Sequence, residues 1–184
     1  MTSVENLVLL GVEDGSFDAF KRNGNALLCC TCMKRNIVID VLFSWIKIDG
    51  IDATEKLLEI LKNTETDVIL LGGISYAGFN LIDAKKIYEI TDIPLIIYSG
   101  KKPDTLSVKR ALRLNFSDWE LRWSIVKNLG RIYSFISKDD CPPIYFEAIG
   151  IDKNDCESIL RYSADLCRIP EPVRVASIIA KGIK

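Results

Sequence analysis

The first quarter of the chain alternates between apolar and polar stretches that have the character of β-strands. Residues 4–12 and 26–33 are largely apolar, and residues 37–48 follow after a short turn. In the third stretch every odd-numbered position from Ile37 to Trp45 is apolar, which is the two-residue period of a strand. Because the connections are short, we expect these three strands to form an antiparallel meander.

Near residue 52 the period changes to that of helices alternating with strands. Asp52 and Glu55 have the spacing of a capping box, and leucines at 57, 58 and 61 supply the apolar face of the helix that would follow. Short apolar runs at residues 67–71 and 94–99 predict buried parallel strands, because helical segments separate them. The other expected elements are helices at residues 81–90, 106–113, 118–129, 152–167 and 171–181 and a strand at residues 144–148.

Three antiparallel strands followed by βαβαβ is the order of the ribonuclease H-like fold. We therefore predict an α/β domain with a mixed five-stranded sheet, extended by an additional C-terminal strand and helices. The first strand is expected to lie centrally, parallel to the fourth. At 184 residues the chain has the length of one domain, and we assign residues 1–184 to it.

The amino-acid composition excludes several catalytic mechanisms and several kinds of binding site. The chain has no histidine, which excludes Ser-His and Cys-His nucleophilic catalysis and imidazole metal ligands. A net charge of -1 provides no global field that would attract nucleic acid. We expect the six cysteines to be reduced, small apolar core residues without zinc. No segment has the pattern of a signal peptide or a membrane span, so we expect a cytoplasmic protein without a membrane partner.

Candidate chemistry collects where the parallel strands end. Ligands of open α/β sheets gather at the carboxyl ends of such strands. The first strand ends at Glu13 and Asp14, the fifth is followed by Lys101, and Asp49 and Asp52 precede the first helix. Carboxylates in this arrangement suit Mg²⁺ or Mn²⁺, and a lysine would offset charge on a phosphate, so we name all five residues as candidate catalytic groups. Glu13, Asp14 and Asp52 are the candidate metal ligands.

A second set of residues is a candidate for contact with DNA or RNA. It comprises Gly73, Tyr76 and Asn80 in the glycine-bearing loop after the fourth strand, with Lys101 and Lys102 after the fifth. Each element also has a plainer interpretation. Glu13 and Asp14 would belong to a turn, Asp52 would be a helix cap, and the two lysines would lie in a solvated loop.

Two helical patterns have the same ambiguity. Lys109 and Arg113 are four residues apart on one helix, which fits either a phosphate-binding face or a solvated one. Trp119, Trp123 and Val126 share one stripe of the next helix, and such a stripe usually packs in the core.

Four segments resemble an archaeal family of uncharacterised proteins related to endonuclease V. They are LGVEDGSF, IDGIDAT, GISYAGFN and IPEPVRVA at residues 10–17, 48–54, 73–80 and 169–176, and the resemblance spans nearly the whole chain. It implies the ribonuclease H-like fold and descent from a Mg²⁺-dependent nuclease. Endonuclease V cleaves nucleic acid near deaminated purines such as inosine.

The resemblance carries over only part of the acidic set. Glu13 stands where relatives usually carry aspartate, Asp14 matches the second acid of the archaeal family, and the next acid is either Asp49 or Asp52. Relatives end the fourth strand with Leu-Asp-Gly, whereas this chain has glycine at position 72. The basic residue after the fifth strand matches Lys101, one position off. The loss of one acidic ligand should weaken the binding of Mg²⁺. Because glycine leaves space, we predict that the side chain introduced by Gly72→Asp could be accommodated.

Three functions remain open from the sequence. The first is a nucleic-acid or nucleotide binder with a degenerate divalent-metal site. The second is an active Mg²⁺-dependent endonuclease that cleaves phosphodiester bonds. The third is a non-catalytic module that binds proteins or small molecules, which the balanced charge favours. The sequence leaves the oligomeric state undetermined.

Overall fold

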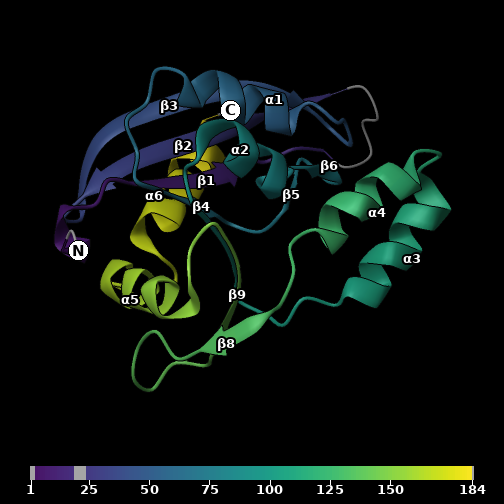
Figure 1. Cartoon of the computed structure of the whole chain (residues 1–184). Helices are drawn as coiled ribbons and strands as arrows, with labels where there is room; N and C mark the ends of the chain where they lie inside the picture. The colour runs from purple at the N-terminus through teal and green to yellow at the C-terminus, as the bar shows by residue number, and fades with distance from the viewer. Residues whose placement is uncertain (1–2, 19–23, 184) are drawn as a thin grey trace.

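A computed structural model, which describes residues 3–18 and 24–183, has a seven-stranded mixed sheet with helices on both faces (Figure 1). The strand order is β3-β2-β1-β4-β7-β9-β8. A separate two-stranded hairpin, β5-β6, follows β4. The strands are β1 (Leu9–Asp14), β2 (Asn25–Lys34), β3 (Ile37–Lys47), β4 (Val68–Leu71), β5 (Ser75–Tyr76), β6 (Asn80–Leu81), β7 (Leu95–Ser99), β8 (Tyr133–Phe135) and β9 (Ile144–Ile149).

The pairing of the strands confirms the predicted fold. Strand β1 lies inside the sheet, antiparallel to β2 and parallel to β4, and β4 is parallel to β7. Strand β3 is antiparallel to β2 at the edge of the sheet, and these five strands are the expected mixed sheet. The expected C-terminal strand, β9, adds antiparallel to β7, and β8, which has no counterpart among the expected strands, pairs with β9.

Two layers of helices bury the apolar faces of the sheet. Helices α1 (Ala53–Leu61) and α2 (Ala84–Thr91) cover one face, and α5 (Lys153–Ser163) and α6 (Glu171–Gly182) cover the other. Helices α3 (Thr105–Asn115) and α4 (Trp119–Lys127) pack on each other beside the sheet. Among the described residues, no helix is both long and apolar enough to cross a bilayer.

Helix α6 approaches β1 closely because Gly11 has no side chain. A Cβ at Gly11 would lie 2.1 Å from the carbonyl carbon of Pro172, so any larger residue would push the helix away. The hydroxyl of Thr31 on β2 donates a 2.6 Å hydrogen bond to the carbonyl of Pro172. The first contact links the segments at residues 10–17 and 169–176, which are distant in sequence, and the second fastens the start of α6 to β2.

Three local expectations were wrong. Residues Val4–Asn6 form a short 3-10 helix, so the first strand begins only at Leu9 and continues to Asp14. The Asp52 side chain does not cap α1, and Glu55 instead pairs with Lys86. The expected core stripe of α4 is only half-buried, because Trp119 and Trp123 lie under Arg113 and Lys109 in the contact with α3.

The cysteines are free thiols, and four of the six are buried. Cys29 and Cys32 have the Cys-x-x-Cys spacing of many metal sites. On a strand, residues three apart point to opposite faces, and these two lie in different apolar clusters. They therefore cannot ligate one ion together.

Candidate functional site

The carboxyl ends of β1 and β4 meet the β5-β6 hairpin, and most of the predicted site residues lie here. Glu13 and Asp14 are consecutive, so the geometry of a strand directs their side chains to opposite faces of the sheet. Glu13 points toward β4 on the face that α5 and α6 cover, whereas Asp14 reaches the hairpin. The two carboxylates are therefore separated by the sheet itself.

The Glu13 side chain fills the space beside Gly72. A Cβ at Gly72 would lie 2.1 Å from Oε1 of Glu13, so the expectation of free space at this position was wrong. The glutamate side chain reaches into the volume that an aspartate at position 72 would use. Burial, with a smaller contribution from Asp14, raises the pKa of Glu13 to about 7, and Lys181 on α6 partly offsets this.

Asp14 and Asp49 both hold the turn of the β5-β6 hairpin. Oδ2 of Asp14 accepts a 2.5 Å hydrogen bond from the Ala77 amide, and Oδ1 of Asp49 accepts a 2.9 Å bond from the Phe79 amide. Between these two amides, Ala77 and Gly78 have positive φ angles of 44° and 87°. The two carboxylates therefore stabilise an unusual backbone conformation. Burial raises the pKa of Asp14, while its bond from Ala77 lowers it.

Asp52 and Asn80 form a buried junction at the start of α1. Oδ1 of Asp52 accepts hydrogen bonds from Nδ2 of Asn80 at 2.6 Å and from the Lys47 amide at 3.2 Å. Oδ1 of Asn80 accepts a 2.9 Å bond from the Ala53 amide. Asn80 thus supplies the cap that Asp52 was expected to supply, from a position 27 residues away.

Arg122 joins α4 to this junction, and no sequence pattern pointed to it. Its guanidinium is 5% exposed and donates to the carbonyls of Asp49, Gly50 and Phe79 at 3.0, 2.9 and 2.6 Å. Asp118 at the start of α4 accepts a fourth bond at 2.9 Å. One side chain therefore ties together the segment before α1, the hairpin and α4.

The predicted nucleic-acid contacts fall into three groups. Gly73 is half-buried and has a positive φ of 103°. Tyr76 and Asn80 are enclosed, and the Tyr76 hydroxyl donates toward the carbonyls of Val12 and Gly73. Lys101 and Lys102 are exposed in the loop after β7. Only the lysines therefore present charged groups to solvent.

The residues present do not fit a multi-carboxylate magnesium site. Within residues 3–18 and 24–183, no group of three or more acidic or cysteine side chains is placed to hold an ion. Glu13 and Asp14 diverge, and oxygens of Asp14, Asp49 and Asp52 already accept hydrogen bonds from the protein. Mg²⁺ requires oxygen ligands in a near-ideal octahedron, which this arrangement does not supply.

Beside the hairpin lies a cleft of about 610 Å³ with aromatic walls. The rings of Phe79 and Phe116 meet edge to face at 5.4 Å, and the Arg122 guanidinium lies 4.3 Å from the centre of the Phe116 ring. Polar atoms come from Asp49 and Asn115. The full lining is Phe17, Ile48, Asp49, Gly78, Phe79, Asn115 and Phe116.

Sequence reasoning named only Asp49 of this lining as a site residue. Phe17 and Phe79 lie within the segments at residues 10–17 and 73–80, which resemble the archaeal family. This was the one sequence feature that could have indicated them. Asn115 and Phe116 come from the end of α3, and no motif marks them.

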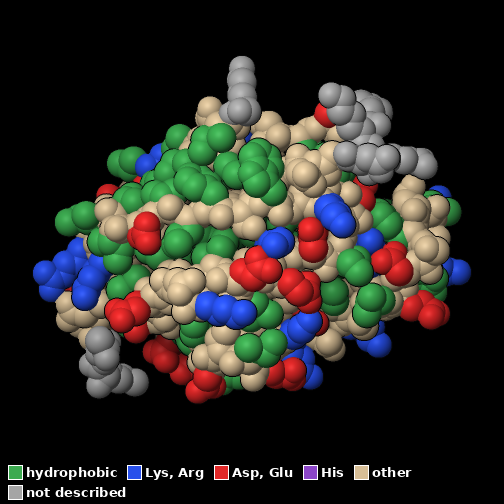
Figure 2. Space-filling model, turned by 90° about the horizontal axis from the view of Figure 1, so that it is seen from above, with side chains coloured by type: hydrophobic (Ala, Val, Ile, Leu, Met, Phe, Trp, Pro, Cys, Tyr) green, Lys and Arg blue, Asp and Glu red, His purple; other side chains and the backbone are tan. Residues whose placement is uncertain are grey.

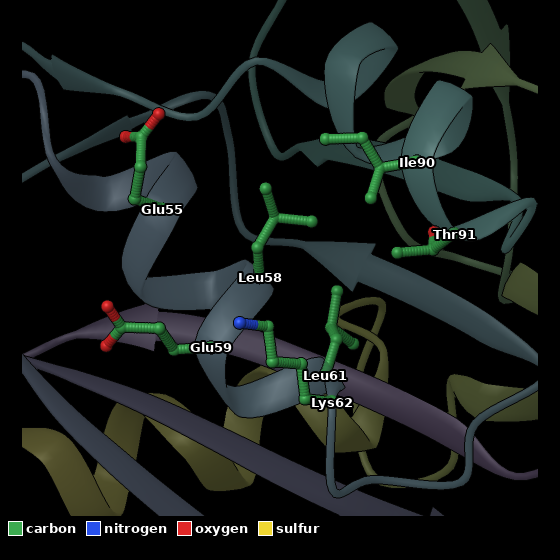
Figure 3. A pocket seen from close by; sticks show the side chains of 7 residues that line it. All are labelled: Glu55, Leu58, Glu59, Leu61, Lys62, Ile90 and Thr91. Atoms are coloured by element: carbon green, nitrogen blue, oxygen red, sulfur yellow. The ribbon is translucent and has the colours of Figure 1, made fainter.

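A second hollow, of about 460 Å³, lies between α1 and α2, where Leu58 and Ile90 point into it (Figure 3). Its lining runs along α1 and includes the last residues of both helices, which precede β4 and β7. It therefore belongs to the amino ends of the parallel strands, opposite the edge at which ligands of such sheets bind.

Comparison with known proteins places the chain among archaeal relatives. A UPF0215 protein of Pyrococcus furiosus is 36% identical over 180 residues, covering 95% of this chain and 91% of the relative. A crystal structure of a protein of unknown function from Archaeoglobus fulgidus has 31% identity and a TM-score of 0.86, covering 97% and 98% of the two chains.

More distant structures share the fold. Endonuclease V of Ciona intestinalis, in complex with DNA containing an inosine, has a TM-score of 0.58 at 16% identity, covering 92% of this chain and 82% of that one. The family model described as Endonuclease dU matches residues 5–184. The chain therefore belongs to the Endonuclease dU family, an archaeal family with the fold of endonuclease V.

Proposed function

We propose that this protein binds nucleic acid along the carboxyl edge of its sheet, with one unstacked base packed in the cleft against the touching rings of Phe79 and Phe116, and that this binding requires no divalent ion. The aromatic cleft is the observation that carries the proposal. Proteins that bind unpaired bases stack them on aromatic rings and hydrogen-bond their edges. In the cleft, Asn115 supplies a donor and an acceptor, and Asp49 supplies an acceptor.

A basic surface leads from this cleft along α3. Lys109, Arg110 and Arg113 line a hollow of about 420 Å³ on the same helix that ends at Asn115. Lys109 and Arg113 also lie over the rings of Trp123 and Trp119, which holds their side chains in place. Local positive charge of this kind can bind a phosphate backbone even though the net charge of the chain is -1.

We propose that the base bound in this cleft is a deaminated one. The family is described as Endonuclease dU, in which dU is the usual abbreviation for deoxyuridine, and the Ciona endonuclease V structure contains inosine-bearing DNA. Asn115 could pair with the carbonyl and imide N–H groups that deamination creates on a base. Nδ2 of Asn115 also donates a 2.8 Å hydrogen bond to the Ala111 carbonyl, which holds the amide in one orientation. An amide held in this way would distinguish uracil from cytosine within the same cleft.

Fluorescence anisotropy in EDTA tests the proposal, with single-stranded oligonucleotides that contain one deoxyuridine, one deoxycytidine or one deoxyinosine. Phe116→Leu keeps an apolar side chain but removes the stacking surface, so we expect at least tenfold weaker binding, since stacking contributes ~1–3 kcal/mol per base. Phe135→Leu, on β8 away from the cleft, is the matched control. Loss of all binding in EDTA, or equal effects of the two variants, would contradict the proposal.

A second candidate is a Mg²⁺- or Mn²⁺-dependent endonuclease. The family description favours it, as does the Glu13 carboxylate beside Gly72, the position where endonuclease V relatives carry an acid. The same oligonucleotides, incubated with each ion, test for strand cleavage. Cleavage that disappears in Glu13→Gln while binding persists would establish this candidate over a purely binding role.

A further inference from the structure

Strand β3 leaves an apolar stripe uncovered at the edge of the sheet. The stripe consists of Val41, Phe43 and Trp45, which share one face of the strand, together with Val38 and Ile39. A β-bulge against β2 shifts the alternation at Ile39, so that Val38 lies on the face of Val41 and Ile37 on the other face. Val38, Ile39, Phe43 and Trp45 are 41, 55, 44 and 57% exposed. Seen from above the view of Figure 1, hydrophobic side chains gather into one continuous area of this surface (Figure 2).

Both faces of β3 are apolar, although only one is covered. On the face opposite the stripe, Leu42 and Ile46 pack into the core with α1. On the face of the stripe, α6 lies over β1 and β2, and of the stripe only Val41 packs into the cluster that α6 forms with β2. An antiparallel sheet with one solvated face carries polar residues there. The stripe instead has the composition of a face buried by another layer.

We propose that a second copy of this chain covers the stripe, forming a two-fold dimer in which the two stripes pack on each other. None of the residues of the stripe is charged, so the stripe offers nothing to a phosphate backbone or an anionic surface. In a two-fold interface the same patch meets itself, so an apolar stripe is complementary to its own copy.

The area of the stripe matches what a stable dimer needs. With ~150–250 Å² for a fully exposed aromatic side chain, the exposed fractions of Val38, Ile39, Phe43 and Trp45 amount to roughly 400 Å² of apolar surface. A standard interface buries about 800 Å² per partner, of which roughly 65% is apolar in homodimers. The stripe can therefore supply most of the apolar part of one partner's share.

The packing would use the face of β3 rather than its edge. Between Cys32 and Met33 the register of β2 against β3 shifts, which marks a β-bulge, and Asp40 is exposed beside it. Bulges and charges on an edge strand oppose the addition of another strand. The open face, in contrast, has no such protection.

Sedimentation equilibrium and light scattering at micromolar concentration test the proposal. We expect a mass of twice 20.7 kDa for the wild-type chain. Phe43→Lys and Trp45→Lys should each weaken dimerisation at least tenfold. Leu166→Lys changes a more exposed apolar side chain elsewhere and should leave the dimer intact.

Circular dichroism of each variant separates loss of dimer from loss of fold, and folded monomers are the expected result. Quenching of the Trp45 fluorescence by iodide provides a second readout, in a Trp119→Phe/Trp123→Phe background. The quenching of Trp45 should increase on dilution as the dimer dissociates. A wild-type chain that stays monomeric, or lysine variants that dimerise like the wild type, would overturn the proposal.

Discussion

Among single residues, Glu13 and Gly72 have to be considered together. In the endonuclease V relatives that the sequence resembles, an aspartate stands at each position. Here the longer acid lies on β1 and its carboxylate occupies the space beside the glycine on β4. Gly72 does not have a positive φ, so its backbone would admit a side chain. The nearest obstacle to an aspartate at position 72 is therefore the Glu13 side chain.

We predict that Gly72→Asp by itself destabilises the protein by roughly 1–3 kcal/mol, because the new Cβ would overlap the Glu13 carboxylate. Glu13→Asp/Gly72→Asp should recover most of that loss, since the shorter acid leaves room. Thermal melting with and without Mn²⁺ measures both effects. Mn²⁺ should raise the melting temperature of the double variant more than that of the wild type. A Gly72→Asp protein as stable as the wild type would show that Glu13 moves freely.

Among the elements, α4 depends on one side chain for its attachment to the site. Arg122 donates hydrogen bonds to three carbonyls that belong to the segment before α1 and to the hairpin. The attachment also positions the cleft, because Phe116 precedes α4 directly and its ring lies against Arg122. Movement of α4 would therefore change the distance between the two walls of the cleft.

We predict that Arg122→Met lowers the free energy of unfolding by about 3–5 kcal/mol, because it leaves Asp118 and the three carbonyls without their partner. Chemical denaturation measures this loss. Arg110→Met, an exposed arginine on α3, is the control and should change stability by less than ~0.5 kcal/mol. If oligonucleotide binding falls in Arg122→Met under conditions where the variant is folded, the helix pair positions the cleft. Equal stability of both variants would refute this role.

For the whole molecule, two buried acids make stability depend on pH. Burial raises the pKa of Glu13 and that of Glu147 on β9 from 4.5 to about 7. The native state therefore holds protons that the unfolded state releases between about pH 4.5 and 7. Stability from these groups is fully present below that window and is lost as the pH rises through it.

We predict that the free energy of unfolding falls between about pH 5 and pH 8 as the two acids ionise, by on the order of 2–3 kcal/mol for each, and that the melting temperature falls with it. Glu13→Gln and Glu147→Gln should each flatten the curve, because glutamine stays neutral. Glu65→Gln, at an exposed position, should leave the slope unchanged. Melting curves measured across this pH range test the prediction. A wild-type protein whose stability rises toward pH 8 would contradict the assignment.

The amino-acid sequence by itself determined the order of elements and thereby the fold. The two-residue and 3.6-residue periods follow from backbone geometry, so each can be recognised within a dozen residues. Short connections then required the antiparallel meander, and alternating helices required the parallel strands. The carboxyl end of β1 could be located for the same reason, which brought Glu13 and Asp14 to the correct edge of the sheet. The short strand β8 escaped detection because three residues are too few to show a period.

Only the tertiary structure decided what those residues contact. Asn80 caps α1 across 27 positions, and Arg122 reaches the Asp49 carbonyl across 73. The cleft depends on a contact between Phe79 and Phe116, which lie on separate elements. Contacts of this kind depend on how packed elements are placed relative to one another, and no local pattern encodes that placement. The sequence therefore predicted where the acids lie, whereas packing determined that Glu13 occupies the space beside Gly72 and that Asp14 and Asp49 hold the hairpin.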